Sequence, residues 1–152
     1  MKRFTHWIWW VIGILVLALL AASCKPSSPS TASDSIQGIV WQWTNLTNQT
    51  TKETTAIPNP ENYTITFNSD GTLEGKADCN TITGTYSQEN GFSIELGAMT
   101  QAYCGDASMD RQYLSLLSNV AAGGPDGAGN LALETAGGEQ RMLFNNGGVV
   151  SK

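Results

Sequence analysis

Apolar and polar residues alternate in short segments from residue 36 onward, and Gly, Asn and Asp separate the segments. A period of two is typical of strands that bury one face. Within 63–67 the alternation places Tyr63, Ile65 and Phe67 inward and the two threonines outward. The complete pattern predicts strands at 39–43, 63–67, 72–77, 82–86, 92–96, 130–134 and 141–144.

The residues between these strands predict how they connect. Asn68-Ser69-Asp70-Gly71 predicts a hairpin turn, because Gly71 can adopt a positive φ angle. Residues 87–91 predict the turn of a second hairpin. Two segments without alternation, 45–60 and 97–108, are expected to form loops, and residues 123–127 a further turn.

One segment changes period from two to between three and four. Its apolar residues predict an amphipathic helix over 109–120, with Ser108 as the N-cap and Asp110 in the first turn. One helix among about seven strands predicts the α+β class. We therefore expect a small, curled, antiparallel, barrel-like sheet with the helix packed against it, occupying residues 36–147.

The N-terminal residues predict an export signal over 1–23. Basic Lys2 and Arg3 precede the apolar stretch 7–22, which is shorter than a comfortable membrane span. The following Leu20-Ala21-Ala22-Ser23-Cys24 resembles the bacterial lipobox, which implies lipid attachment at Cys24 and anchoring to the cell membrane. The alternative is an uncleaved helix with Cys24 free.

Residues 24–35 are predicted to form a tether between the lipid and the domain. They are rich in Ser and Pro and contain no large apolar residue that could join a core. Both interpretations of the N-terminus place residues 25–152 outside the cytoplasmic membrane. If the source is Gram-negative, Lys25 favours the outer membrane, because it occupies the position where an Asp would resemble an inner-membrane retention signal.

Charge and histidine content narrow the functional classes. Residues 24–152 contain six basic and thirteen acidic residues, a formal charge of −7, which disfavours nucleic acid as a partner. The chain has a single histidine, His6, and it lies in the predicted signal. Histidine-dependent nucleophiles, general bases and zinc sites are therefore not expected in the exported part.

Two cysteines remain after Cys24. In an oxidising compartment Cys79 and Cys104 have one possible intramolecular pairing, and a structural disulfide is the favoured interpretation. A redox-active pair and a metal site are the alternatives. A redox pair usually has the spacing Cys-x-x-Cys, and a metal site would need further soft ligands.

Several of these segments together resemble the META domain, also called the HslJ-like family. The resemblance extends from about 36 to 144 and rests on the following residues: Trp41-Gln42-Trp43, Phe67-Asn68-Ser69-Asp70-Gly71, Asp78-Cys79-Asn80, Gly84-Thr85-Tyr86, Met99-Thr100, Cys104 and 110–117. It implies a small α+β barrel-like domain of envelope lipoproteins and heat-shock-associated proteins, without an established catalytic activity. The departures are the long 45–60 segment, Asp78 where glycine is common, and the Gly-rich stretch after the helix.

Candidate contact residues lie beside the second cysteine. Thr100, Gln101 and Tyr103 are predicted to contact a partner. Asp78 and Asn80 could form a polar site, but Asx side chains commonly bond nearby backbone at turns, so a structural role beside the disulfide is favoured.

The expected function is that of a non-enzymatic envelope lipoprotein, a binding or structural module linked to stress tolerance, with no cofactor and no metal. The alternative is a carrier of a small apolar ligand or peptide, whose cavity would be lined by Trp41, Trp43, Tyr63, Phe67, Tyr86 and Phe92. Core filling is the favoured role for these aromatics. A hydrolase, or an inhibitor of one, is a third hypothesis, with only carboxylates to offer: Asp78, Asp106 and Asp110.

Overall fold

Nine strands, one α-helix and two one-turn 3₁₀ helices make up residues 35–150, the part of the chain that the computed structural model describes. In chain order they are β1 (Ile39–Asn48), β2 (Thr54–Ala56), η1 (Pro60–Asn62), β3 (Tyr63–Phe67), β4 (Thr72–Ala77), β5 (Asn80–Ser87), β6 (Ser93–Met99), α2 (Asp110–Ser118), β7 (Val120–Pro125), β8 (Leu131–Thr135), η2 (Ala136–Gly138) and β9 (Gln140–Val149). The predicted signal, Cys24 and the predicted tether up to residue 34 lie outside the described residues.

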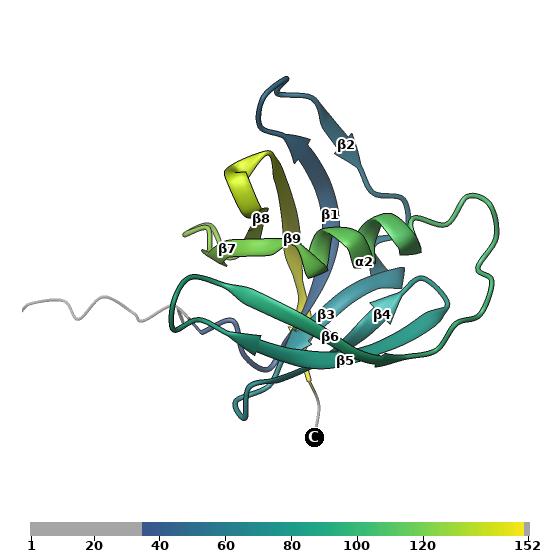
Figure 1. The fold of residues 1–152 in the computed structure, drawn as a ribbon, viewed down its shortest axis with the longest axis horizontal. Helices are drawn as coiled ribbons and strands as arrows, with labels where there is room; N and C mark the ends of the chain where they lie inside the picture. Colours follow the sequence, from purple (N-terminus) through teal and green to yellow (C-terminus); the bar gives the residue numbers. More distant parts are fainter. Residues whose placement is uncertain (1–34, 151–152) are drawn as a thin grey trace, which may run out of the picture. The chain divides into compact units, whose positions relative to one another are not determined.

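The strands form one antiparallel sheet that curls toward closure. Its order is β6-β5-β4-β3-β1-β9-β8-β7, with the short β2 paired to β1 (Figure 1). The two edge strands approach each other at one end, where the Phe92 amide donates to the Ala121 carbonyl oxygen at 3.1 Å. The predicted α+β class and curled, barrel-like sheet are confirmed.

Both predicted hairpins are present. β3 pairs with β4, and β5 pairs with β6 through Tyr86 opposite Ile94. In the first turn the Asn68 amide donates to the Thr72 carbonyl at 2.9 Å, and Gly71 has a φ of +83°. A side chain at Gly71 would strain this backbone, which is why glycine suits the position.

The helix packs against β4 and β6 and is slightly shorter than predicted (Figure 1). Tyr113 and Leu117 are its buried residues. The N-cap prediction is wrong by one residue, because Met109 occupies the cap and the Ser108 hydroxyl accepts a bond from the Asp110 amide at 3.2 Å. Within residues 35–150, no helix is both long and apolar enough to cross a membrane.

The segment predicted as a loop over 45–60 is largely a second strand pair. β1 continues to Asn48, and β2 folds back on it with Leu46 opposite Thr55. Thr and Asn composition suggested a loop, but β1 also has β9 as a partner along most of its length. Pairing on both sides outweighs local propensity in a sheet.

Two other loop assignments are corrected in the same way. The predicted turn at 123–127 lies mostly in β7, whose residues 120–125 pair with β8. The predicted loop from 97 begins only after Met99, because β6 pairs with β5 as far as that residue. The turn between β7 and β8 begins at Asp126, whose Oδ1 accepts hydrogen bonds from the Ala128 and Asn130 amides at 2.8 and 3.0 Å.

The core agrees with the predicted inward residues, with one correction. Tyr63, Ile65 and Phe67 are buried, but Thr64 and Thr66 are buried as well. The register places Thr64 between Gln42 and Lys76, and such longer neighbours on the same sheet face cover a short side chain. β3 is therefore buried on both faces at the middle of the sheet.

Candidate functional site: the disulfide loop

A disulfide fastens the long connection between β6 and α2 to the β4–β5 turn. It joins Cys79, in that turn, to Cys104, and their Cα atoms are 5.6 Å apart. We call residues 100–109 the disulfide loop. The predicted pairing of the two cysteines is confirmed, and the loop contains all three residues predicted to contact a partner.

Asn80 hydrogen-bonds the disulfide loop through its side chain. Its buried side chain donates from Nδ2 to the Ala102 carbonyl at 3.0 Å. Its Oδ1 accepts from the Ala102 amide at 2.7 Å and from the Thr100 hydroxyl at 3.0 Å. A buried carboxamide with this many partners fixes the backbone around it, so the predicted structural role of Asn80 is confirmed.

Asp78 and Tyr63 fasten the far end of the disulfide loop. The Tyr63 hydroxyl donates to the Asp78 carboxylate at 3.3 Å and accepts from the Met109 amide at 2.9 Å. Asp78 has a φ of +58°, a left-handed conformation that explains why glycine suits this position. This link was missed from the sequence, where Tyr63 carries only the signal of a core aromatic.

The three predicted contact residues differ in their exposure and in their hydrogen bonds. Thr100 and Gln101 are exposed, but the Thr100 hydroxyl is already engaged, since it also accepts from the Thr81 amide at 2.9 Å. Tyr103 is 74% exposed, the largest aromatic surface among the described residues. The structure thus brings the three together on one loop and leaves Tyr103 as its most prominent side chain.

Tyr103 has a hydrogen-bond partner that was not predicted from the sequence. Its hydroxyl donates to the Asp106 carboxylate within the disulfide loop. This hydrogen bond, with a smaller contribution from desolvation, raises the pKa of the Tyr103 phenol above its ordinary value. The hydrogen bond also ties the exposed Tyr103 ring to Asp106 in the same loop.

Comparison with known proteins assigns the family. The family model described as the META domain matches residues 34–147, well over half of the chain. The chain belongs to the META domain family. The resemblance in the sequence is therefore confirmed, and the matched segment contains both disulfide cysteines and the whole disulfide loop.

Two solved structures share the fold of this META domain. One is a DUF4847 family protein from Bacteroides vulgatus, with 14% identity and a TM-score of 0.56, covering 76% of this chain and 96% of its own. The other is an NMR structure of a protein from Burkholderia xenovorans, with 19% identity and a TM-score of 0.56, covering 83% and 92%. Comparison with the curated proteins found no match.

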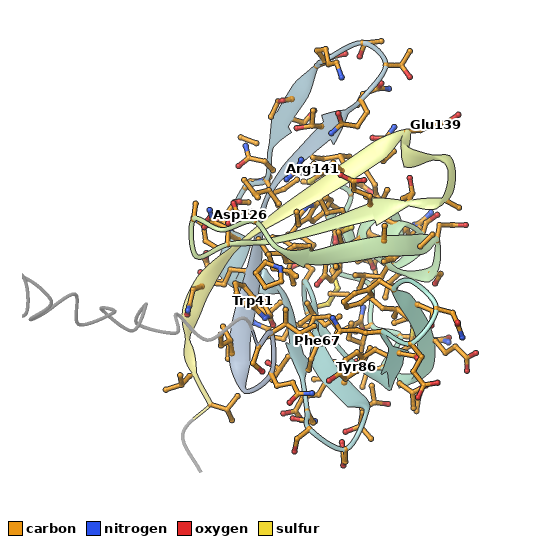
Figure 2. All side chains as sticks on the ribbon, turned by 90° about the vertical axis from the view of Figure 1, so that its left-hand side faces the viewer. Trp41, Phe67, Tyr86, Asp126, Glu139 and Arg141 are labelled. Atoms are coloured by element: carbon orange, nitrogen blue, oxygen red, sulfur yellow. A yellow bond between two sulfur atoms is a disulfide. The ribbon has the colours of Figure 1, made fainter. Side chains whose placement is uncertain are left out.

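The interior of the META domain is filled by aromatic contacts. Trp43 stacks on Tyr113 with ring centroids 5.2 Å apart, and Tyr63 meets both rings edge-on. A second group joins Phe67 to Tyr86 and Phe92. In Figure 2, Trp41, Phe67 and Tyr86 are labelled in the lower part of the view, away from Glu139. These rings fill the core, as the sequence favoured.

The candidate acids of the hydrolase hypothesis serve separate hydrogen bonds. Asp78 accepts from Tyr63, Asp106 from Tyr103, and Asp110 from the Arg111 amide at 2.7 Å. Among the described residues, no three His, Cys, Asp or Glu side chains gather as metal ligands. The carboxylates have roles in turns, in the disulfide loop and at the helix start.

Two shallow depressions lie on the surface of the domain. The larger, of about 530 Å³, is lined by Gln37, Asp70 and Val150 together with Ser35, Gly38, Asn68 and Ser69. The smaller, of about 280 Å³, lies over β7, β8 and β9 and includes Arg141, which forms an ion pair with Glu134 at 3.8 Å. Both linings mix polar and small residues and include none of the core aromatics.

Removing the hydroxyl group from each of two buried tyrosines is expected to change the stability of the fold in opposite directions. The Tyr113 hydroxyl is fully buried and has no hydrogen-bond partner among residues 35–150, whereas the Tyr63 hydroxyl makes two bonds. We expect Tyr113→Phe to raise the free energy of unfolding by about 1 kcal/mol, and Tyr63→Phe to lower it by about 1 kcal/mol. Urea denaturation of both variants measures this. A loss of stability in Tyr113→Phe would show that its hydroxyl has a partner.

Proposed function

We propose that this META domain is a non-enzymatic binding module of the cell envelope and that the disulfide loop contacts a protein partner. One observation carries the proposal: Tyr103 is 74% exposed on a loop fastened by the disulfide, Asn80 and the Tyr63 hydroxyl. An ordered aromatic loses little conformational entropy on binding, which is why tyrosines serve as anchors at interfaces. Gln101, two residues before Tyr103, is exposed as well.

A non-enzymatic role is supported by the separate uses of the candidate acids. Asp78, Asp106 and Asp110 each accept a hydrogen bond from a different donor. Paired-acid chemistry instead requires two carboxyl groups that face one substrate with different pKa values. Stress tolerance is the process that the family resemblance implies, and we propose it as the setting of this binding role.

Carriage of an apolar ligand is the second candidate, and the packing argues against an interior site. The six aromatics proposed as its lining are buried or half-buried. Five of them pack in two core groups, Trp43 with Tyr63, and Phe67 with Tyr86 and Phe92. The larger depression, at Gln37 and Asp70, is lined mainly by polar and small residues, whereas apolar ligands prefer pockets lined by apolar and aromatic side chains.

Capture of a partner by crosslinking tests the proposed contact. The full chain is crosslinked in intact cells as wild type, as Tyr103→Ala and as the matched control Val149→Ala, which also removes an exposed apolar side chain. We expect Tyr103→Ala to reduce capture of one dominant protein at least about tenfold, the cost of losing an aromatic anchor. Equal capture by all three proteins would contradict contact through the disulfide loop.

The lipid anchor is proposed from Cys24, which lies outside the described residues. The small residues before this cysteine and the apolar stretch 7–22 support export and lipid attachment, with the outer membrane as the address in a Gram-negative source. Several acyl chains at about 0.8 kcal/mol per buried CH₂ would make the attachment practically permanent.

A Cys24→Ser variant tests the anchor. We expect it to lose incorporation of labelled fatty acid and to leave the membrane fraction, while its Cys79–Cys104 disulfide forms as before. Unchanged labelling and fractionation would instead favour an N-terminal helix that is retained.

A further inference from the structure

The two cysteines of the disulfide differ in their exposure to solvent. Cys79 is exposed in the β4–β5 turn, whereas Cys104 is half-buried in the disulfide loop. Exchange of a disulfide begins when a thiolate reaches one sulfur and displaces the other. Access alone therefore favours attack on Cys79 Sγ.

The hydrogen-bond donors around the disulfide are also unequal. The Cys79 backbone amide lies 3.3 Å from Cys104 Sγ, and Asn80 Nδ2 lies 3.2 Å from the same sulfur. Within residues 35–150, no N–H group donates to Cys79 Sγ. The Ala102 carbonyl oxygen is 3.6 Å from Cys104 Sγ and 4.0 Å from Cys79 Sγ, so it distinguishes the sulfurs only weakly.

Donors at Cys104 Sγ favour one direction of bond cleavage. N–H groups stabilise a thiolate and lower its pKa, and a thiolate of lower pKa leaves faster. Asn80 cannot easily turn its amide away, because Nδ2 also donates to the Ala102 carbonyl and Oδ1 accepts from the Ala102 amide. The donor is thus in place before the bond opens.

We propose that Cys79 Sγ is a site of thiol–disulfide exchange with an external thiol, and that Cys104 is the leaving sulfur. A thiolate attacks Cys79 Sγ and forms a mixed disulfide, while the Cys79–Cys104 bond breaks and its electron pair moves to Cys104 Sγ. A second thiol then attacks the mixed disulfide, which leaves Cys79 reduced and joins the two external sulfurs. The two external thiols supply the two electrons, so a protein dithiol or a pair of small thiols is the co-reactant. This inference does not depend on the proposed partner contact.

Asn80 is the positioning residue in this scheme. The Asn80 side chain faces Cys104 Sγ. Its hydrogen bonds to Ala102 also fix the backbone two residues before the displaced cysteine. The displaced thiolate therefore stays near the mixed disulfide and can close the original bond again. This makes the exchange reversible and keeps the loop attached to the domain.

Trapping the mixed disulfide on the full oxidised chain tests the proposal. The probe is 2-mercaptoethanol, a small thiol that carries no charge other than that of its reactive thiolate. After acid quenching, free thiols are alkylated and peptides are mapped by mass spectrometry. We expect the probe on Cys79 and the alkyl group on Cys104 in at least about tenfold excess over the reverse, the factor that one hydrogen bond to a charged sulfur supplies. Equal amounts, an excess on Cys104 or no adduct would overturn the proposal.

Two variants test the role of Asn80. Asn80→Asp removes the Nδ2 donor, and we expect the excess on Cys79 to fall to within about twofold of equal. Thr100→Val removes a different bond to Asn80 and leaves Nδ2 in place, so it should keep the excess. An undiminished excess in folded Asn80→Asp would show that access alone decides. If that variant does not fold, the distribution in the wild-type chain decides the proposal.

Discussion

We expect the double variant Cys79→Ser/Cys104→Ser to lose about 3.5 kcal/mol in free energy of unfolding. The disulfide closes a segment with a sequence separation of 25 residues, and an open chain of that length gains conformational entropy when it unfolds. Small domains are stable by only about 5–15 kcal/mol, so the loss is a large share of the total. Urea denaturation of oxidised wild type and of the double variant measures it.

The control for this prediction is wild-type protein reduced with excess thiol. Reduction opens the same bond without changing the sequence, so its unfolding curve should coincide with that of the double variant. Asn80 still bonds Ala102 in both proteins, and we therefore expect the fold itself to remain. A loss below about 1 kcal/mol would contradict the view that this bond is a main source of stability.

Gly75→Ala is expected to lower the free energy of unfolding by about 3 kcal/mol or more. Gly75 pairs with Ile65 in β3 and with Ile82 in β5. A methyl group at this position would overlap the Thr64 carbonyl oxygen. Backbone atoms cannot move aside as a flexible side chain can, so the strands would have to separate.

Gly97→Ala is the matched control in the same sheet. A methyl group at Gly97 would meet the Thr83 carbonyl oxygen at 3.5 Å, an ordinary contact, and the residue is exposed on β6. We expect a change within about 0.5 kcal/mol for this variant. Similar effects of the two substitutions on thermal or urea unfolding would contradict the close approach of β3 and β4 at Gly75.

Segments with strong alternation and a clear turn were predictable from sequence. The hairpins around Gly71 and residues 87–91, and the helix that buries Tyr113 and Leu117, match the predicted elements closely. In each, local pattern and tertiary environment favour the same structure. The inward positions of 63–67 follow from the two-residue period for the same reason.

Segments whose composition opposes their structure were not predictable. Gly123-Gly124-Pro125 has the composition of a turn, yet it pairs with β8 at the edge of the sheet. The close approach of β8 explains the glycine at position 123, since a methyl group there would press on Leu133 and on the Ala132 carbonyl. A sequence window of a few residues carries no information about that distant strand.

The candidate site also contains features that the sequence predicts and features that it does not. The cysteine pairing followed from their number, and the support from Asn80 followed from the behaviour of Asx residues at turns. The bonds of Tyr63 to Asp78 and Met109 join residues far apart in the chain, and only the fold brings them together. The partner of Tyr103 within its own loop depends on backbone geometry that no pattern describes.

Peptide mapping of the native protein, taken from the cell envelope and alkylated without reduction, shows whether the exported domain contains the disulfide. We expect a peptide pair joined through Cys79 and Cys104, and an acylated Cys24 at the new N-terminus. Alkylation of both Cys79 and Cys104 as free thiols in freshly isolated protein would contradict an exported domain whose disulfide loop is fastened by oxidation.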